Sequence, residues 1–379
     1  MTVGDLAESE GEPPSPELLL RRLGSFELRQ WSVPAHNRWL SAGVFLVELS
    51  GGRRAVLKHL SSEPPAGETD WEAHWSRRSS EPRHWNYWRR EALCYRSGLS
   101  QCYRDSGIFA PGLLALDENE KDAVLLIERV SGRPGESWDL GSYRRAAQCL
   151  GRAQGSWAGC DWETGHEWLS QGFLHDYSAE KPVAWELLQS DEAWSHPLAR
   201  ECFPPGLREA ASLFHEERER LWAIGESLPR TLCHLDFWPK NLFEQEGGFS
   251  LIDWSFAGGG AVGEDPGNLV PDSVADHFIP ASQLAALEAA VFEGYLAGLR
   301  QAGWQEDPEL VRLGMWASAV KYDWLMPFTL AQLEDARQRA YGGGPEVDAR
   351  FRFRERGAVL AHLSRWAASA LALADRLGI

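Results

Sequence analysis

The pattern of hydrophobic and polar residues changes near residue 131. Before that point the chain has short apolar runs bounded by glycine and proline, which is typical of strands. Residues 43–49 and 54–60 form two such runs, and the glycines at 51–52 predict a tight turn between them. Two later runs, "APGLLALDEN" and "DAVLLIERV", predict a second strand pair. This part of the chain is therefore expected to form a small β-sheet.

One helix is predicted within this strand-rich part. Apolar side chains recur there at helical spacing, and they are Trp85, Trp88, Ala92 and Tyr95. Proline is favoured at the start of a helix and glycine just past its end, so we expect the helix to run from near Pro82 to near Gly98. Glu91 lies beside the apolar stripe of this helix.

Beyond residue 131 most of the chain is predicted to be helical. The breaker "SGRPG" at 131–135 marks the change. The helical segments are "YRRAAQCLGRAQGSW", "PVAWELLQ", "LREAASLFHEERERLWAIGESL", "ASQLAALEAAVFEGYLAGLR", "PELVRLGMWASAVKYDWLMPF" and "VLAHLSRWAASALALADRL". We divide the chain into a flexible arm at 1–20, an N-terminal lobe at 21–130 and a C-terminal lobe at 131–379.

Composition narrows the class of protein. At 379 residues the chain is long enough for two lobes that each bury an interior. Its formal charge of −17 argues against binding to nucleic acid. Its six cysteines have no CxxC spacing, which argues against a disulfide framework or a zinc site. The N-terminus lacks a signal-peptide pattern, and no apolar run could span a membrane, so we expect a cytoplasmic protein.

Residues 230–259, "RTLCHLDFWPKNLFEQEGGFSLIDWSFAGG", form a strand-bearing island in the helical lobe. His234, Asp236 and Asn241 stand in the arrangement HxDxxxxN, and a predicted hairpin, "NLFE" and "FSLI", leads to Asp253. Such a hairpin can return Asp253 to the side of Asp236 and Asn241. An ordinary polar surface hairpin would carry the same residues, so other parts of the chain must distinguish the two interpretations.

Phosphoryl transfer would use these residue types. Mg²⁺ prefers oxygen ligands and keeps several waters, so Asn241 and Asp253 are sufficient to hold it against the phosphates of a nucleotide. Asp236 fits the carboxylate that orients an attacking hydroxyl and takes its proton. His234 would brace the loop through hydrogen bonds.

A lysine and a glutamate upstream are further candidate residues for phosphoryl transfer. Lys58 lies in "AVLK" on a predicted strand, and Glu91 lies on the next helix. An ion pair between them would direct Lys58 at the α- and β-phosphates of a nucleotide, as in kinases. Taken alone, Lys58 would usually be a solvated residue at a sheet edge. Glu91 alone would be a surface charge that Arg89 or Arg90 satisfies.

With these motifs together, the chain resembles the aminoglycoside phosphotransferase and choline kinase family from about residue 25 onward. The matching segments are "AVLK", "WRREALCY", "LLIERVSG", "HLDFWPKNLF" and "LIDWSFAG". The resemblance implies an α+β, bilobal protein-kinase-like fold. It has a small N-terminal β-sheet lobe with one key helix, which binds the nucleotide. A larger, mainly helical C-terminal lobe carries catalysis and binds the substrate.

The resemblance also implies roles for single residues. Asp236 would be the catalytic base, and Asn241 and Asp253 would bind Mg²⁺. Lys58 would contact the phosphates of ATP, with Glu91 as its partner. The motif "IDW" in place of "DFG", without an "APE" segment, favours a small-molecule kinase over a protein kinase.

Two further segments have implied roles. The backbone from Glu128 to Val130 would hold the adenine, and Asp265 in "GEDPGNL" would order the loop behind the active site. The expected nucleotide loop, "VPAHNRWLSAGV", has a single glycine, Gly43, so Asn37 or Arg38 is an alternative phosphate contact.

The catalytic motifs also depart from the family. Leu235 and Lys240 stand where the family often has glycine. Gln154 stands where a histidine is usual, and Ser255 replaces the glutamate of "DWE". These changes suggest a divergent subgroup.

An acceptor hydroxyl must lie within hydrogen-bond reach of Asp236, in a cleft walled by the helices after residue 265. Candidate wall residues are the tryptophans and aspartates on or after the loop: Trp238, Asp272, Asp276, Trp316, Asp323 and Trp324. Each is equally compatible with a core tryptophan or a solvated aspartate. An acidic and aromatic wall would suit an aminoglycoside, an amino sugar or a choline-like cation.

The sequence therefore predicts an ATP- and Mg²⁺-dependent phosphotransferase, a small-molecule kinase acting on a hydroxyl. A related enzyme for a lipid-precursor alcohol would differ only in its substrate. The alternative from another class is a pseudokinase, or a nucleotide-binding scaffold without turnover. The poor glycine loop favours that alternative, whereas the retained Lys58, Asp236, Asn241 and Asp253 oppose it.

Overall fold

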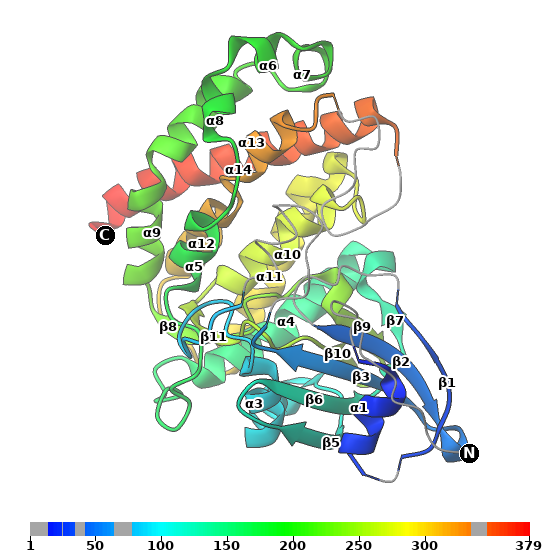
Figure 1. The fold of residues 1–379 in the computed structure, drawn as a ribbon. Coiled ribbons are helices and arrows are strands. Elements are labelled where there is room, and N and C mark those ends of the chain that lie inside the picture. Colours follow the sequence, from blue (N-terminus) through cyan, green and yellow to red (C-terminus); the bar gives the residue numbers. More distant parts are fainter. Residues whose placement is uncertain (1–13, 25, 35–41, 64–77, 335–346) are drawn as a thin grey trace.

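Two lobes make up the chain, a small sheet lobe and a larger helical lobe (Figure 1). The computed structural model describes residues 14–24, 26–34, 42–63, 78–334 and 347–379. The predicted α+β, bilobal arrangement is confirmed. In the described part of the chain, no helix is both long and apolar enough to cross a membrane.

A five-stranded antiparallel sheet forms the small lobe. Its strands, in spatial order, are β1 (Leu28–Ser32), β2 (Gly43–Leu49), β3 (Arg54–Ser61), β6 (Asp122–Glu128) and β5 (Leu113–Glu118). Buried and half-buried residues alternate along β2, so the sheet has two distinct faces. One face packs Phe45 and Leu57 against Leu19 and Leu20, whereas Leu60 on the other face packs against the helix α3.

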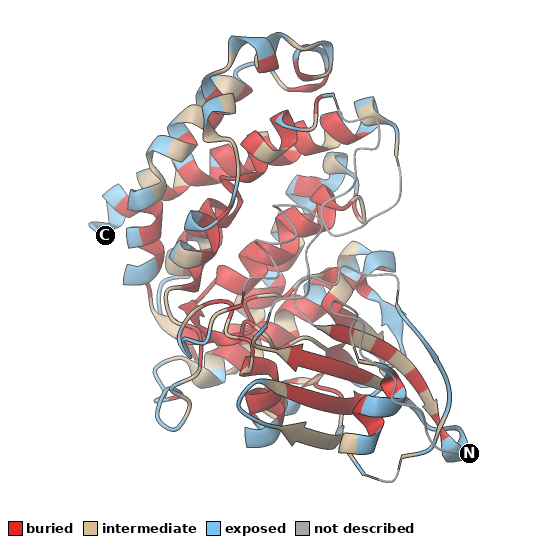
Figure 2. Ribbon diagram, in the orientation of Figure 1, coloured by how far each residue is buried: buried red, intermediate tan, exposed pale blue. Residues whose placement is uncertain are grey.

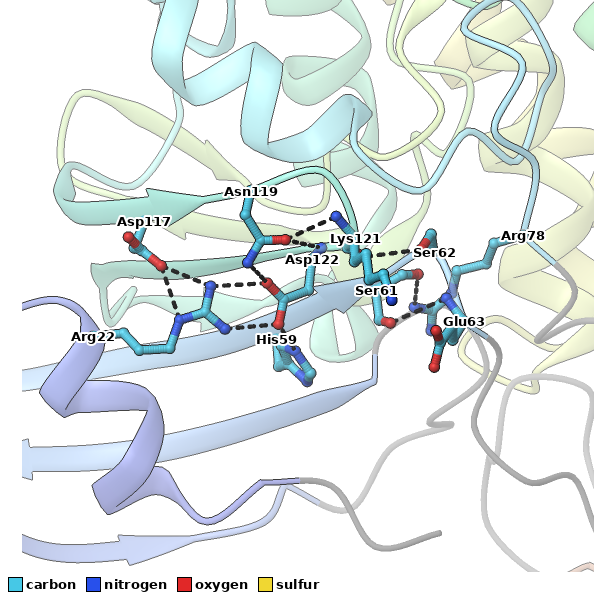
Figure 3. Close-up of polar contacts among 10 residues, drawn as sticks. All are labelled: Arg22, His59, Ser61, Ser62, Glu63, Arg78, Asp117, Asn119, Lys121 and Asp122. Carbon is cyan, nitrogen blue, oxygen red and sulfur yellow. Dashed lines mark hydrogen bonds and ion pairs between the residues drawn. The ribbon is translucent and has the colours of Figure 1, made fainter. Parts of the chain in front are cut away.

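Arg22, the last residue of helix α1 (Pro16–Arg22), joins this helix to strands β5 and β6 of the sheet. The Arg22 guanidinium donates to Asp117 at 2.7 and 2.8 Å and to Asp122 at 2.7 and 2.8 Å (Figure 3). His59 lies 3.0 Å from the same Asp122 carboxylate. Residues 16–20 of the predicted arm lie in this helix, while residues 1–13 lie outside the described residues.

The helix α3 (Arg90–Ser97) is shorter than predicted. It ends as expected at Gly98, whose φ of 81° suits glycine. It begins at Arg90 rather than near Pro82, because residues 82–89 form turns. Three backbone carbonyls of that stretch accept hydrogen bonds from the Arg90 side chain, so they do not serve a helical ladder.

Helices form most of the large lobe, and their buried sides face one another (Figure 2). They are α4 (Leu140–Trp157), α5 (Phe173–Ala179), α6 (Asp191–Ser195), α7 (Pro197–Cys202), α8 (Leu207–Glu216), α9 (Arg218–Ser227), α10 (Glu264–Ala275), α11 (Leu284–Gln301), α12 (Pro308–Ala317), α13 (Leu325–Leu330) and α14 (Ala349–Leu377). The segment predicted as one helix over 207–228 is two helices that meet at Glu217, and "PVAWELLQ" forms only the 3₁₀ turn Trp185–Gln189.

Short strands join the two lobes. The strands β4 (Ile108–Phe109), β10 (Gly248–Leu251), β9 (Leu242–Gln245) and β7 (Arg133–Pro134) form one sheet in that order, and β8 (Arg230–Cys233) pairs with β11 (Gly258–Ala261). The hairpin β9–β10 is the predicted "NLFE" and "FSLI" pair. Its strand β10 runs parallel to β4, so the hairpin is anchored to a segment just before β5.

Helices α4 and α11 approach so closely that glycine is required between them. A Cβ atom at Gly298 would lie 2.1 Å from the carbonyl oxygen of Gln148, and one at Gly151 would lie 2.1 Å from that of Tyr295. Backbone atoms cannot give way as a flexible side chain can. This contact fixes α4, which carries Gln154 beneath the predicted site.

We expect Gly298→Ala to destabilise the protein by about 1–3 kcal/mol, because the methyl group overpacks a backbone contact. Gly141→Ala, in the exposed first turn of α4, is the matched control. It should change the stability by less than about 1 kcal/mol, because its Cβ would meet only side-chain atoms, at 3.3 Å or more. Urea unfolding would measure both changes, and equal effects would contradict the close-packing argument.

Candidate active site

The Lys58 ammonium and the Glu91 carboxylate form the predicted ion pair. Lys58 lies on β3, between Val44 of β2 and Leu125 of β6, and only 8% of it is exposed. Its Nζ donates to both Glu91 carboxylate oxygens, at 2.7 and 2.9 Å. Burial lowers the pKa of Lys58, but the carboxylates of Asp253 and Glu91 raise it by more, so the ammonium form is held. Lys58 is therefore a fixed buried cation.

Asp253 is brought to this pair by the hairpin. Its carboxylate lies 3.8 Å from Lys58 Nζ. Its φ of 63° is unusual for a residue other than glycine, which is typical of backbone held in place at a functional site. The hydroxyl of Ser255 donates to Asp253 Oδ1. Ser255, a departure from the family pattern, therefore orients this carboxylate.

Asp236 and Asn241 lie on the loop after β8, and the loop closes on itself. Asn241 Nδ2 donates to Asp236 Oδ2 at 2.7 Å and to the Asp236 carbonyl at 3.0 Å. The N–H of Ile252 donates to the Asn241 carbonyl at 3.0 Å, which places Asn241 beside the end of β10. Burial, and then the charges of Asp253 and Asp272, raise the pKa of Asp236 well above its usual range. These aspartates therefore face a common region.

His234 braces the loop, as expected. The ring is completely buried, and its Nε2 lies 3.1 Å from the carbonyl oxygen of Ile252. It packs edge-on against Trp254 at a centroid distance of 4.9 Å. Burial lowers the pKa of His234 to about 4, so the ring is neutral at physiological pH. His234 is a positioning residue in this geometry.

Asp265 holds the loop from behind. Its two carboxylate oxygens accept the N–H groups of His234 at 2.8 Å and of Leu235 at 2.7 Å. Leu235 has a φ of 64°, a conformation that glycine adopts without strain. This explains why a glycine is common at this position and why Leu235 needs the Asp265 contact. The predicted ordering role of Asp265 agrees with these two bonds.

Gln154 links Asp265 to the helical core. Its Nε2 donates to Asp265 Oδ2 at 2.7 Å, and its Oε1 accepts from the Tyr295 hydroxyl. Its backbone carbonyl accepts from the Thr231 hydroxyl at 2.7 Å. Gln154 is completely buried, so it serves the bracing function for which a histidine was expected.

The acceptor side of the loop is acidic. Asp272 on α10 accepts from the Tyr322 hydroxyl at 2.9 Å and from Asn268 Nδ2 at 3.3 Å. Burial raises the pKa of Asp272 to about 7, although Lys321 opposes the shift. Lys321 itself donates to Asn268 Oδ1. The polar network therefore continues from the loop into α10.

Asp276 lies one turn further along and is buried without a hydrogen bond. Only 1% of it is exposed, and neither carboxylate oxygen has a hydrogen-bond partner among the described residues. Burial raises the pKa of Asp276 to about 8, while the charge of Lys240 lowers it. Lys240 Nζ also lies 5.6 Å from the ring centre of Trp238, which is half-buried on the loop. Trp238 and Asp272 thus lie near Asp236, whereas Asp276 lies near Lys240 of the same loop.

The other three predicted wall residues have different partners. Trp324 is completely buried, and its Nε1 donates to the Lys321 carbonyl at 2.7 Å. Asp323 faces His215, whose Nδ1 lies 3.4 Å away. Trp316 donates to Glu288 of α11 at 3.0 Å. These partners lie outside the loop that carries Asp236, and within the described residues the structure does not bring the three side chains to that loop.

The predicted adenine-binding backbone lies at the end of β6. The N–H of Glu128 donates to Gly112 at 2.9 Å, and its exposed side chain lies 3.3 Å from Arg53. Val130 is half-buried just beyond the strand. The expected phosphate contacts Asn37 and Arg38 lie outside the described residues.

Neither neighbouring arginine satisfies Glu91, contrary to the local alternative. Arg89 lies 3.3 Å from Glu118, and Arg90 donates only to backbone carbonyls. Sequence reasoning also missed Asn268, Lys321 and Tyr322. The only sequence signal for these three residues is their helical spacing, which places polar side chains in otherwise apolar segments.

Comparison with known families decides between the hairpin interpretations. The model of the phosphotransferase enzyme family matches residues 34–307. The chain belongs to the phosphotransferase enzyme family. The predicted family and enzyme class are thereby confirmed. None of the curated proteins compared with the chain matches it.

Solved structures share the fold of this phosphotransferase. An aminoglycoside phosphotransferase from Alicyclobacillus acidocaldarius matches with a TM-score of 0.54 and 14% identity, over 98% of this chain and 100% of that chain. An amicoumacin kinase in complex with AMP-PNP and Ca²⁺ matches with a TM-score of 0.51 and 14% identity, over 94% and 93% of the chains. At this identity the likeness concerns the fold, which is the protein-kinase-like fold predicted above.

The donor set of the phosphotransferase fits a magnesium ion. Asn241 uses its amide nitrogen on Asp236, so its amide oxygen is the atom left for a cation. Asp253 supplies a carboxylate whose second oxygen is not occupied by Ser255. A carboxylate and an amide oxygen, completed by waters and phosphates, suit the preference of Mg²⁺.

We expect Asp276→Asn to stabilise the phosphotransferase in a pH-dependent way. In the folded protein the pKa of Asp276 rises from its ordinary value of 3.8 to about 8. Between these values the folded chain keeps a proton that the unfolded chain has lost. The free energy of unfolding therefore falls with rising pH, by at most about 1.4 kcal/mol per unit for one group.

The variant lacks this loss, so its melting temperature should exceed that of the wild type at pH 8, and the difference should shrink as the pH falls toward 4. Asp105→Asn, at an exposed aspartate, is the control and should follow the wild type throughout this range. A difference between Asp276→Asn and wild type that does not change with pH would contradict the assignment.

Proposed function

We propose that this phosphotransferase moves the γ-phosphoryl group of ATP, in a Mg²⁺-dependent reaction, to a hydroxyl of a small polar molecule. One observation carries the proposal: strand, helix, loop and hairpin converge so that Lys58 lies 2.7 Å from Glu91 and 3.8 Å from Asp253. Asp236 adjoins this group and contributes to the pKa of Lys58. A cation, a metal ligand and a base thus share one site, as phosphoryl transfer requires.

Each residue has a distinct task in this proposal. Lys58 binds phosphate oxygens, and its hydrogen bonds to Glu91 orient it. Asn241 and Asp253 hold the Mg²⁺ ion, which supplies charge neutralisation at the phosphates when bound. The oxygen of the acceptor hydroxyl bonds to the γ-phosphorus, and Asp236 accepts the proton that this hydroxyl loses. The bond from that phosphorus to the bridging oxygen breaks, and ADP leaves. The backbone from Glu128 to Val130 binds the adenine in the same proposal.

The environment of Asp236 supports its role as the base. The Asp253 charge is one cause of its raised pKa. A Mg²⁺ ion held by Asn241 and Asp253 would offset that charge, which would favour the ionised form of Asp236 that can accept a proton. Proton uptake by this base would then depend on occupation of the nucleotide site.

The acceptor is expected to carry an amino group or another cation. Asp272 and Asp276 are buried carboxylates beside the loop, and Asp276 has no hydrogen bond among the described residues. An ammonium group of the acceptor would favour the ionised form of both carboxylates and pair with them. Trp238 offers a ring to the same molecule. Of the structural neighbours, one is named an aminoglycoside phosphotransferase and another an amicoumacin kinase.

Turnover with an acceptor panel tests the proposed reaction. ATP consumption with Mg²⁺ would be measured across aminoglycosides, amino sugars and choline analogues. Asp236→Asn should lower kcat by roughly 10²- to 10⁴-fold, because the general base is lost. Asp323→Asn is the matched control, since that aspartate is also buried but faces His215, and it should retain activity. Nucleotide binding without turnover on any acceptor would instead favour a scaffold without catalysis.

The acceptor side can be tested separately. Asp272→Asn and Asp276→Asn should raise the KM for a cationic acceptor by about tenfold or more, because a charge-assisted hydrogen bond is lost. The KM for ATP should change little. Equal changes in both KM values would show that these aspartates support the whole site rather than the acceptor.

A further inference from the structure

Arg90 is a buried arginine whose partners are all backbone carbonyls. It is completely buried, and each of its five N–H groups has an acceptor. The acceptors are the carbonyl oxygens of Trp168 (2.9 Å from Nε), Trp85 and Ser255 (2.8 and 3.0 Å from Nη1), and Pro82 and His84 (2.9 and 2.6 Å from Nη2).

These acceptors belong to three segments that are far apart in the sequence. The stretch 82–85 precedes α3, Trp168 lies in the loop between α4 and α5, and Ser255 follows the predicted metal ligand Asp253 by two residues. One guanidinium group therefore connects the start of α3 with two segments of the large lobe. A planar fork of five donors can make such a connection, whereas a lysine ammonium offers three donors from one point.

One more contact joins α3 to the same segment. Cys94 Sγ donates to the Trp254 carbonyl at 3.7 Å. Arg90 and Cys94 thus hold residues 254 and 255 directly after Asp253. Any shift of α3 would move Glu91 away from Lys58 and disturb Asp253 at the same time.

Stability alone does not explain a charge in this place. No ion pair joins Arg90 to a carboxylate within the described residues. Burying a cation without an opposite charge is costly, and burial lowers the pKa of Arg90 to about 9. What the residue provides is geometry, since five fixed hydrogen bonds set the position of three chain segments.

We propose that Arg90 is a positioning residue that docks α3 onto the 254–255 segment before any nucleotide binds. Glu91, Lys58 and Asp253 are then already aligned in the free protein, and nucleotide binding needs no movement of α3. This inference rests on the proposed function for its effect on catalysis, but the docking itself is a property of the free protein. The two can therefore fail separately.

Hydrogen exchange of the wild-type protein tests the docking without any variant. Backbone amides of residues 91–97 should be protected in the free protein, and adding AMP-PNP with Mg²⁺ should change their exchange by less than about twofold. Fast exchange in the free protein, with protection of more than about tenfold on nucleotide binding, would overturn the proposal. It would show that the ligand docks the helix.

Variants then test whether Arg90 is the cause. Arg90→Lys keeps the charge but loses the fork, so α3 amides in the free protein should exchange roughly tenfold faster. Two controls accompany it. Arg96→Lys alters an exposed arginine of the same helix, and Leu363→Ala lowers stability from the core of α14. Neither should change exchange in α3 selectively. If Leu363→Ala speeds exchange in α3 as much as Arg90→Lys does, Arg90 has only a general structural role.

Kinetics separate positioning from simple loss of stability. With a working acceptor, Arg90→Lys should lower kcat on the order of tenfold to a hundredfold through misplacement of Glu91 and Asp253, while the acceptor KM stays near the wild-type value. An unchanged kcat would contradict the proposal. If the wild type shows no turnover at all, the proposed function fails, and the exchange data still decide whether Arg90 docks α3.

Discussion

Burial of charge is the constraint on which the rest of this structure depends. A phosphoryl-transfer site keeps charges where water is scarce, and each charge there needs an opposite charge or hydrogen bonds. Lys58 has this compensation in Glu91 and Asp253. Because the three residues come from a strand, a helix and the end of a hairpin, their mutual compensation determines how the two lobes meet.

A second layer of buried polar groups holds that arrangement in place. Asp265 accepts two amides of the loop and is itself linked to α4 by Gln154. Arg90 has the corresponding role beside α3, where it donates to backbone carbonyls, whereas Asp265 accepts from backbone amides. Asp276 differs from these, since no described residue hydrogen-bonds to it. A buried carboxylate without a hydrogen bond, beside the loop of the proposed base, is consistent with the proposed acceptor bringing its own charge.

Much of this arrangement is local enough to be read from the sequence. The strand 43–49 and the hairpin after Asn241 follow from alternation and turn residues, and the Lys58–Glu91 pair follows from their order along the chain. The start of α3 cannot be read from the sequence in this way. The Arg90 side chain donates to carbonyls that a longer helix would have used. Two further partners of Arg90, Trp168 and Ser255, are remote in sequence. Trp316 and Trp324 illustrate the same limit. Helical spacing puts them on a buried face but does not say which neighbour that face meets.

A crystal structure with AMP-PNP and Mg²⁺ would test the central claim most directly. The account predicts a metal ion bonded to Asn241 and Asp253 at about 2.0–2.1 Å, with Lys58 on the phosphates and α3 unmoved. The γ-phosphoryl group should point toward Asp236. Phosphates bound elsewhere, or a metal ion that does not touch Asp253, would contradict it.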